Sequence, residues 1–142
     1  MPVRKAHAVW NGTLKEGSGE MAGESGAVKG AYSFGTRFGD KQGSNPEELI
    51  GAAHAGCFSM ALSGLLEEAG YAPQQIETDA AVKIEKQNEG FKITGIRLTT
   101  KGRVPDIDAS HFDELAQQAK AGCPVSQALA GTSITLEAEL VE

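Results

Sequence analysis

Two cysteines are the residues of this 142-residue chain that could carry covalent chemistry. Cys123 stands directly before Pro124, at the expected N-cap of a short helix that ends at Gly131. Unpaired N–H groups at a helix N-terminus favour a thiolate, so the residues alone predict Cys123 as the more reactive thiol. Cys57 lies in a segment without charged side chains, residues 49–66, where burial is expected to raise its pKa. Without a C-x-x-C spacing, the two thiols can react with each other only if the fold brings them together.

A thiolate at Cys57 needs a nearby cation at neutral pH. No Lys or Arg lies within a helical turn of it, and the arginine candidates are Arg4, Arg37, Arg97 and Arg103. We prefer Arg37, because residues 31–38 are expected to form a strand that leads into the helix. Glu47 lies roughly 15 Å before Cys57 on a continuous helix, too far to touch the sulfur. It could bind the far side of the guanidinium bidentately, or it could only stabilise the helix dipole.

His54 precedes Cys57 by one helical turn, so both are expected on one helix face. A Cys–His pair is one interpretation. A hydrogen-bonded core histidine is preferred, because no third residue is seen to orient the ring. A zinc site built on His54 and the two cysteines would need further ligands from His7, His111 or carboxylates. Because these ligands are missing from the motif, no metal is expected. The glycines also have no nucleotide-binding spacing, so no cofactor is expected.

The helix that carries Cys57 has clear start and stop signals. The expected positions are Asn45 at the N-cap, Pro46 at N1 and Glu48 at N3, with Glu48 closing a capping box. Its expected end is Ala69, followed by Gly70 at C′. Apolar residues occur on every side, so the helix must be covered on all sides. The run is rich in Ala, Gly and Ser, so we expect a buried core helix and not a membrane span.

Alternating apolar residues predict strands around this helix. Short strands are expected at 7–10, 19–22 and 31–38, and a last strand at 132–141. Segments 76–86 and 91–101 predict a hairpin that turns at 88–90, with a bulge at Gly95. A second helix is expected to be capped by Ser110, to end at Gly122, and to bury Phe112, Leu115, Ala116 and Ala119. The length of the chain predicts a single domain, 1–142.

Composition excludes several classes of partner. Thirteen basic and nineteen acidic residues give a net charge of −6, without a basic cluster. Nucleic acid and anionic membranes are therefore not expected as partners. The first five residues lead into no apolar signal core, so a cytoplasmic location is expected.

Three segments closely resemble the OsmC family of osmotically inducible thiol peroxidases. They are NPEELIGAAHAGCFSMAL at 45–62, TRF at 36–38 and KAGCPVSQ at 120–127, and the early WNG at 10–12 also fits. The resemblance is closer to the OsmC branch than to the related organic hydroperoxide resistance proteins. It implies an intertwined α+β homodimer with long central helices packed between curved antiparallel sheets. A partner subunit would also cover a helix that is apolar on every side.

The resemblance also implies roles for individual residues. Cys57 is implied as the peroxidatic thiol that becomes a sulfenic acid, and Cys123 as the thiol that resolves it as a disulfide. This reverses the order of reactivity expected from the residues alone. Arg37 and Glu47 map onto the activating and anchoring positions. The implied substrates are organic hydroperoxides, with hydrogen peroxide weaker, and the implied reductant is an external dithiol such as a lipoyl-bearing protein.

Two alternatives stay open at this point. One is a non-enzymatic, stress-related binding or structural protein whose two cysteines are buried and idle. The other is thiol–disulfide exchange with protein partners, which the missing C-x-x-C disfavours.

Overall fold

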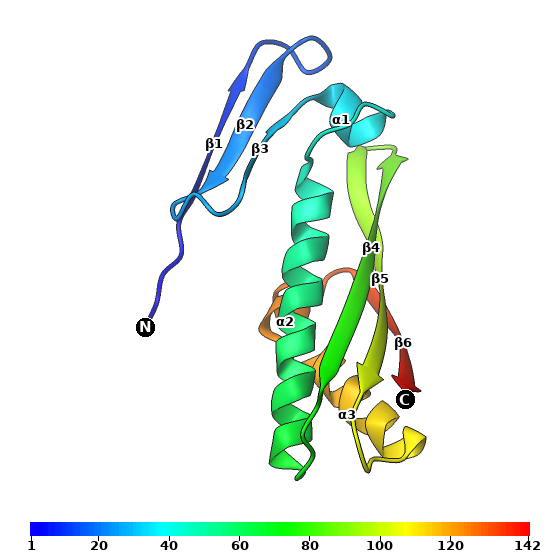
Figure 1. Cartoon of the computed structure of the whole chain (residues 1–142). Helices are drawn as coiled ribbons and strands as arrows, with labels where there is room; N and C mark the ends of the chain where they lie inside the picture. The colour runs from blue at the N-terminus through cyan, green and yellow to red at the C-terminus, as the bar shows by residue number, and fades with distance from the viewer. The chain divides into compact units, whose positions relative to one another are not determined.

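The computed structural model describes the whole chain, which forms two compact units. The N-terminal unit comprises Met1–Leu49 and the C-terminal unit Ile50–Glu142 (Figure 1). The prediction of a single domain is not tested by this division and stays a prediction.

The N-terminal unit is built on a small antiparallel sheet. Its strands are β1 (Ala6–Asn11), β2 (Ser18–Gly23) and β3 (Lys29–Tyr32), in the order β1-β2-β3. The rings of Trp10 and Tyr32 pack with centroids 5.3 Å apart. The first two short strands expected from sequence are therefore present, whereas β3 shares only residues 31–32 with the expected third strand.

Residues 31–38 do not form one strand, so that prediction was wrong. A short helix, α1 (Phe34–Phe38), follows β3 directly. The Ser33 hydroxyl accepts a hydrogen bond from the Thr36 N–H, and the Thr36 hydroxyl accepts one from the Ser33 N–H at 2.8 Å. This reciprocal capping box starts a helix at Phe34, although the aromatic residues around it favour a strand.

The long helix α2 (Pro46–Glu68) starts and stops close to the predicted positions. The Asn45 side chain accepts the Glu48 N–H at 2.8 Å, which confirms the N-cap. The Glu48 carboxylate makes no return bond and is exposed, so the expected capping box is not formed. At the other end Gly70 has φ +95°, and the Tyr71 N–H donates to the Leu66 carbonyl at 2.9 Å, a left-handed C-cap.

The C-terminal unit has a mixed three-stranded sheet. β4 (Gln75–Gln87) and β5 (Gly90–Arg103) form the predicted hairpin, and the register shifts between Lys83 and Ile84, opposite Gly95, as the predicted bulge requires. β6 (Ser133–Val141) pairs parallel to β5, so this sheet is not wholly antiparallel as expected. A parallel pair needs a crossover, and α3 (Ala109–Gly122) and α4 (Pro124–Ala128) supply it.

The start of α3 differs from the prediction. Its N-cap is Asp108, whose carboxylate accepts the His111 N–H at 2.7 Å, and Ser110 already lies inside the helix. The four predicted apolar residues of α3 are all buried, and the helix ends at Gly122 as expected. α4 ends at Ala128, before the predicted Gly131.

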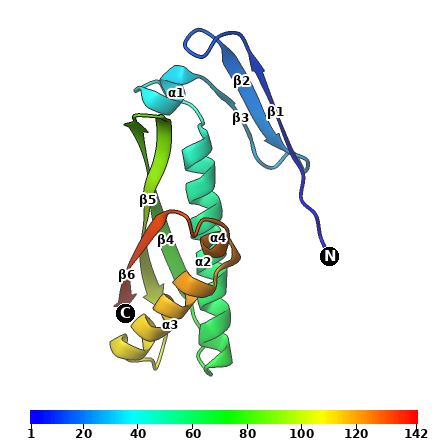
Figure 2. The same cartoon turned by 180° about the vertical axis from the view of Figure 1, so that it is seen from behind.

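The core of the C-terminal unit lies between α2, α3 and one face of the sheet. Phe58, Leu62 and Leu66, at four-residue spacing on α2, are fully buried. They join Ile96 and Leu98 of β5 and the apolar stripe of α3 in one cluster. Figures 1 and 2 show α2 running beside β4, with α3 and α4 next to it.

This chain covers only one face of α2. Met60 is 79% exposed, and the small residues Ala52, Ala53, Gly56 and Gly64 are exposed as well. By length and composition alone α2 could also cross a membrane, and 28% of its most apolar window is buried. α2 was expected to be covered on all sides, but within a single chain only one of its faces is buried.

Candidate active site

The fold brings the two cysteines together. Cys57 lies in the middle of α2, and Cys123 is the residue between α3 and α4. Their sulfur atoms lie 2.8 Å apart in a hydrogen bond, and both thiols are free. Cys123 is fully buried and Cys57 partly buried. The sequence analysis required the fold to bring the two thiols together before they could react with each other, and the fold does so.

The environments of the two sulfurs favour the anion on Cys123. Burial raises the pKa of the Cys57 thiol, and its hydrogen bond with Cys123 raises it further. Burial also acts to raise the pKa of Cys123, but groups around the sulfur outweigh it and lower the pKa. These groups are the Cys57 thiol, the Ser126 N–H and hydroxyl, and the Val125 N–H. When such a close pair of thiols loses its first proton, the two sulfurs share the proton that remains.

His54 is a buried histidine bonded to Ser126 and not to a cysteine. Its Nε2 lies 2.7 Å from the Ser126 hydroxyl of α4. This confirms the preferred interpretation of His54 as a hydrogen-bonded core residue. Its Nδ1 is buried without a partner, and burial lowers the pKa of the ring. Ser126 was not singled out from the sequence, because no periodicity or spacing links it to His54.

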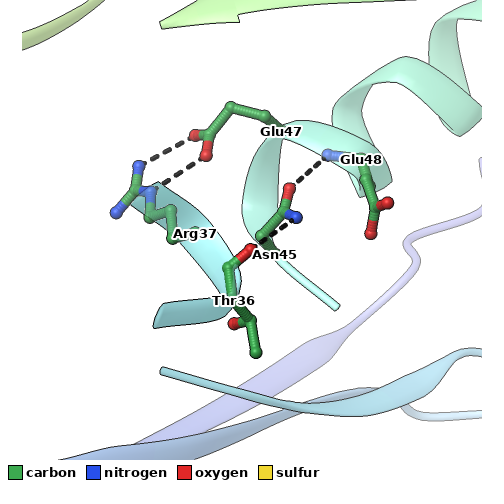
Figure 3. A network of polar contacts seen from close by, with 5 residues as sticks. All are labelled: Thr36, Arg37, Asn45, Glu47 and Glu48. Atoms are coloured by element: carbon green, nitrogen blue, oxygen red, sulfur yellow. Dashed lines mark hydrogen bonds and ion pairs between the residues drawn. The ribbon is translucent and has the colours of Figure 1, made fainter. Parts of the chain in front are cut away.

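Arg37 and Glu47 form the predicted bidentate pair (Figure 3). Arg37 Nε and Nη2 each donate to a Glu47 carboxylate oxygen at 2.9 Å. Figure 3 shows Glu48 turned away from the guanidinium, so Glu47 is the anchor. The Glu47 side chain is 8% exposed and the Arg37 side chain 34%. The guanidinium carbon of Arg37 lies 5.2 Å from the centre of the Phe38 ring, within the range of a cation–π interaction.

The start of α2 is tied to α1, so the pair is held in place from both sides. The Asn45 amide donates to the Thr36 carbonyl at 3.2 Å while its oxygen caps α2. The two bonds to Glu47 use Arg37 Nε and Nη2, so Nη1 lies outside this ion pair. Arg37 and Glu47 belong to the N-terminal unit and the cysteines to the C-terminal unit. Activation of Cys57 by Arg37 therefore stays a prediction.

Comparison with known proteins gives consistent matches. The OsmC-like protein family model matches residues 39–139. Peroxiredoxin OsmC of Escherichia coli (strain K12) is 53% identical over 138 residues, which cover 96% of each chain. Organic hydroperoxide resistance protein OhrA of Bacillus subtilis (strain 168) is 33% identical over 100 residues, 68% of each chain.

Solved structures agree in fold. The crystal structure of OhrB of Bacillus subtilis matches with a TM-score of 0.71 at 26% identity, over 96% of this chain and 98% of that one. The crystal structure of an OsmC from Legionella pneumophila matches with a TM-score of 0.74 at 20% identity over the full length of both chains, which supports the α+β fold alone. Because the family model spans most of the sequence and a relative shares over half of its residues, the chain belongs to the OsmC family.

Proposed function

We propose that this protein is a cysteine-based peroxidase that reduces organic hydroperoxides to alcohols, and hydrogen peroxide more weakly. The observation that carries the proposal is the hydrogen-bonded pair of free thiols, Cys57 and Cys123, with sulfurs 2.8 Å apart. Relatives named peroxiredoxin and organic hydroperoxide resistance protein support the same chemistry.

The reaction needs both sulfurs in turn. The Cys57 thiolate attacks one peroxide oxygen, the O–O bond breaks, and the departing alkoxide takes a proton to become the alcohol. Cys57 is thereby oxidised to a sulfenic acid. Cys123 then attacks this sulfur, the S–O bond breaks, and a disulfide and water form. An external dithiol, for which we propose a lipoyl-bearing protein, donates two electrons and restores both thiols.

Arg37 and Glu47 are proposed to serve the first step. The Nη1 side of the guanidinium, which Glu47 does not bind, would stabilise the Cys57 thiolate and the charge that develops on the departing oxygen. Glu47 would orient the guanidinium from the other side. Around Arg37 lies a cavity of about 200 Å³ that is lined mainly by aromatic side chains. Its apolar lining residues are Trp10, Leu14, Tyr32, Phe34 and Phe38. An apolar wall next to the guanidinium favours a hydroperoxide with an organic substituent.

We also propose a cytoplasmic homodimer. A second copy would cover the apolar face of α2 that one chain leaves exposed. Sedimentation at micromolar concentration tests the dimer, and a monomer would refute it.

The chain has only two cysteines, so any disulfide within one chain must join Cys57 and Cys123. After one equivalent of an organic hydroperoxide, intact mass should show a Cys57–Cys123 disulfide by the loss of two hydrogens. Cys57→Ser should abolish turnover, and Cys123→Ser should let Cys57 proceed to sulfinic acid under excess peroxide. If peroxide consumption survives the loss of Cys57, or if no disulfide forms, the proposed function is wrong.

A further inference from the structure

A row of polar side chains leads from the buried His54 through Ser126 toward the cysteine pair. His54 Nε2 lies 2.7 Å from Ser126 Oγ, and the Ser126 hydroxyl is among the groups that favour the anion on Cys123. The Cys123 sulfur in turn lies 2.8 Å from that of Cys57. All four residues belong to the C-terminal unit, and the peroxide step proposed above uses neither His54 nor Ser126.

The unpartnered Nδ1 of His54 decides the direction of these hydrogen bonds. If the neutral ring carries its proton on Nδ1, a fully buried N–H is left without an acceptor. The Ser126 hydroxyl must then donate to Nε2 and cannot donate to Cys123. If the proton sits on Nε2, this N–H donates to Ser126 Oγ, and the hydroxyl hydrogen is free for the Cys123 sulfur. Orphaned buried N–H groups are rarer than unused acceptors, so the second arrangement is favoured.

We propose that His54 and Ser126 hold Cys123 as the thiolate that resolves the Cys57 sulfenic acid. This rests on the proposed peroxidase function. The thiolate electron pair forms the S–S bond, the S–O bond breaks, and the departing hydroxide takes a proton from solvent. Ser126 lies one helical turn after Cys123 and is proposed to donate its hydroxyl to the reacting sulfur, whereas His54 acts through Ser126 as a positioning residue. When the dithiol later reduces the disulfide, the same hydrogen bond stabilises the Cys123 thiolate as it leaves.

Hydrogen bonds, and not ion pairs, hold this anion. No charged side chain of the C-terminal unit bonds to Cys123. On α3 the Lys120 ammonium donates to the Ile134 carbonyl at 3.5 Å, and on β6 Glu137 and Glu139 are exposed. On α2 the titratable neighbours are His54 and Cys57 themselves, and α4 carries no charged residue. Removal of the Ser126 hydroxyl should therefore be felt directly by the sulfur.

The first test needs no peroxide. In a Cys57→Ser background Cys123 is the only thiol, and its ionisation can be followed by the ultraviolet absorbance of the thiolate. Ser126→Ala and His54→Leu should each move the midpoint up by about one pH unit, the effect of one lost hydrogen bond to a charged group. Ser126→Thr, which keeps the hydroxyl, and His54→Gln, which keeps an N–H donor, should restore most of the shift.

Ser59→Ala is the matched control. Ser59 is a partly buried serine on the same helix as His54, and its hydroxyl bonds to the Ala55 carbonyl and to Thr78. Ser59 has no hydrogen-bond link to Cys123, so the ionisation midpoint of Cys123 in Ser59→Ala should equal that in the Cys57→Ser parent. If Ser126→Ala and His54→Leu also match the parent, the proposal is wrong. If circular dichroism shows His54→Leu to be unfolded, Ser126→Ala decides alone.

The second test follows the resolving step with both cysteines present. After a pulse of organic hydroperoxide at neutral pH, Ser126→Ala should form the disulfide several-fold more slowly and accumulate more Cys57 sulfinic acid. At alkaline pH Cys123 ionises without help, so the difference should vanish. A defect that persists at alkaline pH indicates a merely structural role and overturns the proposal. Failure of the unsubstituted chain to form any sulfenic acid would instead overturn the proposed function, while the titration still decides the state of Cys123.

Discussion

Replacing Glu47 by glutamine tests whether the Arg37–Glu47 pair acts on the chemistry. Glutamine has nearly the same shape, but it removes the charge and presents an amide N–H to one of the two donating nitrogens of Arg37. One of the two 2.9 Å bonds is therefore lost. A hydrogen bond to a charged group contributes about 1.5–3 kcal/mol. The Arg37 side chain is 34% exposed, so solvent screening reduces the expected loss to roughly 1–1.5 kcal/mol.

The measured quantity is kcat/KM for an organic hydroperoxide. If the lost orientation energy appears in the transition state, Glu47→Gln should lower kcat/KM about tenfold. In a Cys123→Ser background the ionisation midpoint of Cys57 should also rise, since the guanidinium would be less well fixed against the thiolate.

Glu48→Gln is the control. Glu48 lies in the same first turn of α2 and carries the same charge near the helix N-terminus, but its side chain is exposed and makes no hydrogen bond. Both variants lose the same helix-dipole stabilisation, about 0.3–1 kcal/mol. If the two variants have equal kcat/KM, Glu47 only stabilises the helix, and the anchoring role assigned to it is refuted.

Four further predictions concern stability. Gly102→Ala should lower the free energy of unfolding by about 1–3 kcal/mol in urea, because the added methyl group meets the Phe112 ring; an unchanged midpoint would contradict this packing. Asp108→Ala should cost about 1 kcal/mol as a lost N-cap, whereas Ser110→Ala should be nearly neutral, and the reverse order would restore the original prediction. Burial lowers the pKa of His54, so the unfolded chain binds more protons than the folded chain. The free energy of unfolding should therefore be highest above pH 6.5 and should fall as the pH drops through the folded pKa. Urea titrations at several pH values should show a flatter decline for His54→Gln. Thermal unfolding should show one calorimetric transition if the chain is a single domain, and two resolved transitions would exclude it.

Elements that depend on local signals could be predicted from the sequence. The Asn45 cap, the Gly70 stop and the β4–β5 hairpin each need only a few neighbouring residues, and all three are present. The bulge opposite Lys83 could also be predicted, because Phe91 and Ile93 change parity with Ile96 across Gly95. In each case the residue type supplies the backbone conformation or hydrogen bond directly.

The errors occur where two local signals compete. Aromatic residues at 32, 34 and 38 favour a strand, but the Ser33–Thr36 capping box starts α1. Asp108 and Ser110 can both cap a helix, and only the surrounding fold selects Asp108. The parallel pairing of β6 was missed for another reason: alternation shows that a strand is half-buried, but it does not give the direction of its neighbour.

The site was predictable where chemistry restricts the partners. A carboxylate next to a guanidinium has one favoured geometry, and the Arg37–Glu47 pair adopts it. The direct Cys57–Cys123 contact follows from the packing of α4 beside α2, which no spacing in the sequence encodes. The partner of His54 was not foreseen for the same reason, since Ser126 lies 72 residues away.

The two thiols have different stabilising groups, and this bears on the order of the steps. Once the pair of sulfurs, 2.8 Å apart, has lost one proton, it carries one negative charge that either sulfur can hold. Within the C-terminal unit the hydrogen-bond donors favour that charge on Cys123, which suits resolution but not attack on peroxide. The first step therefore needs an additional cation that draws the charge to Cys57, and the Arg37 guanidinium is the group proposed to supply it. On this account Arg37 controls the peroxide step and Ser126 the resolving step, so that their substitutions should slow different steps of the same cycle.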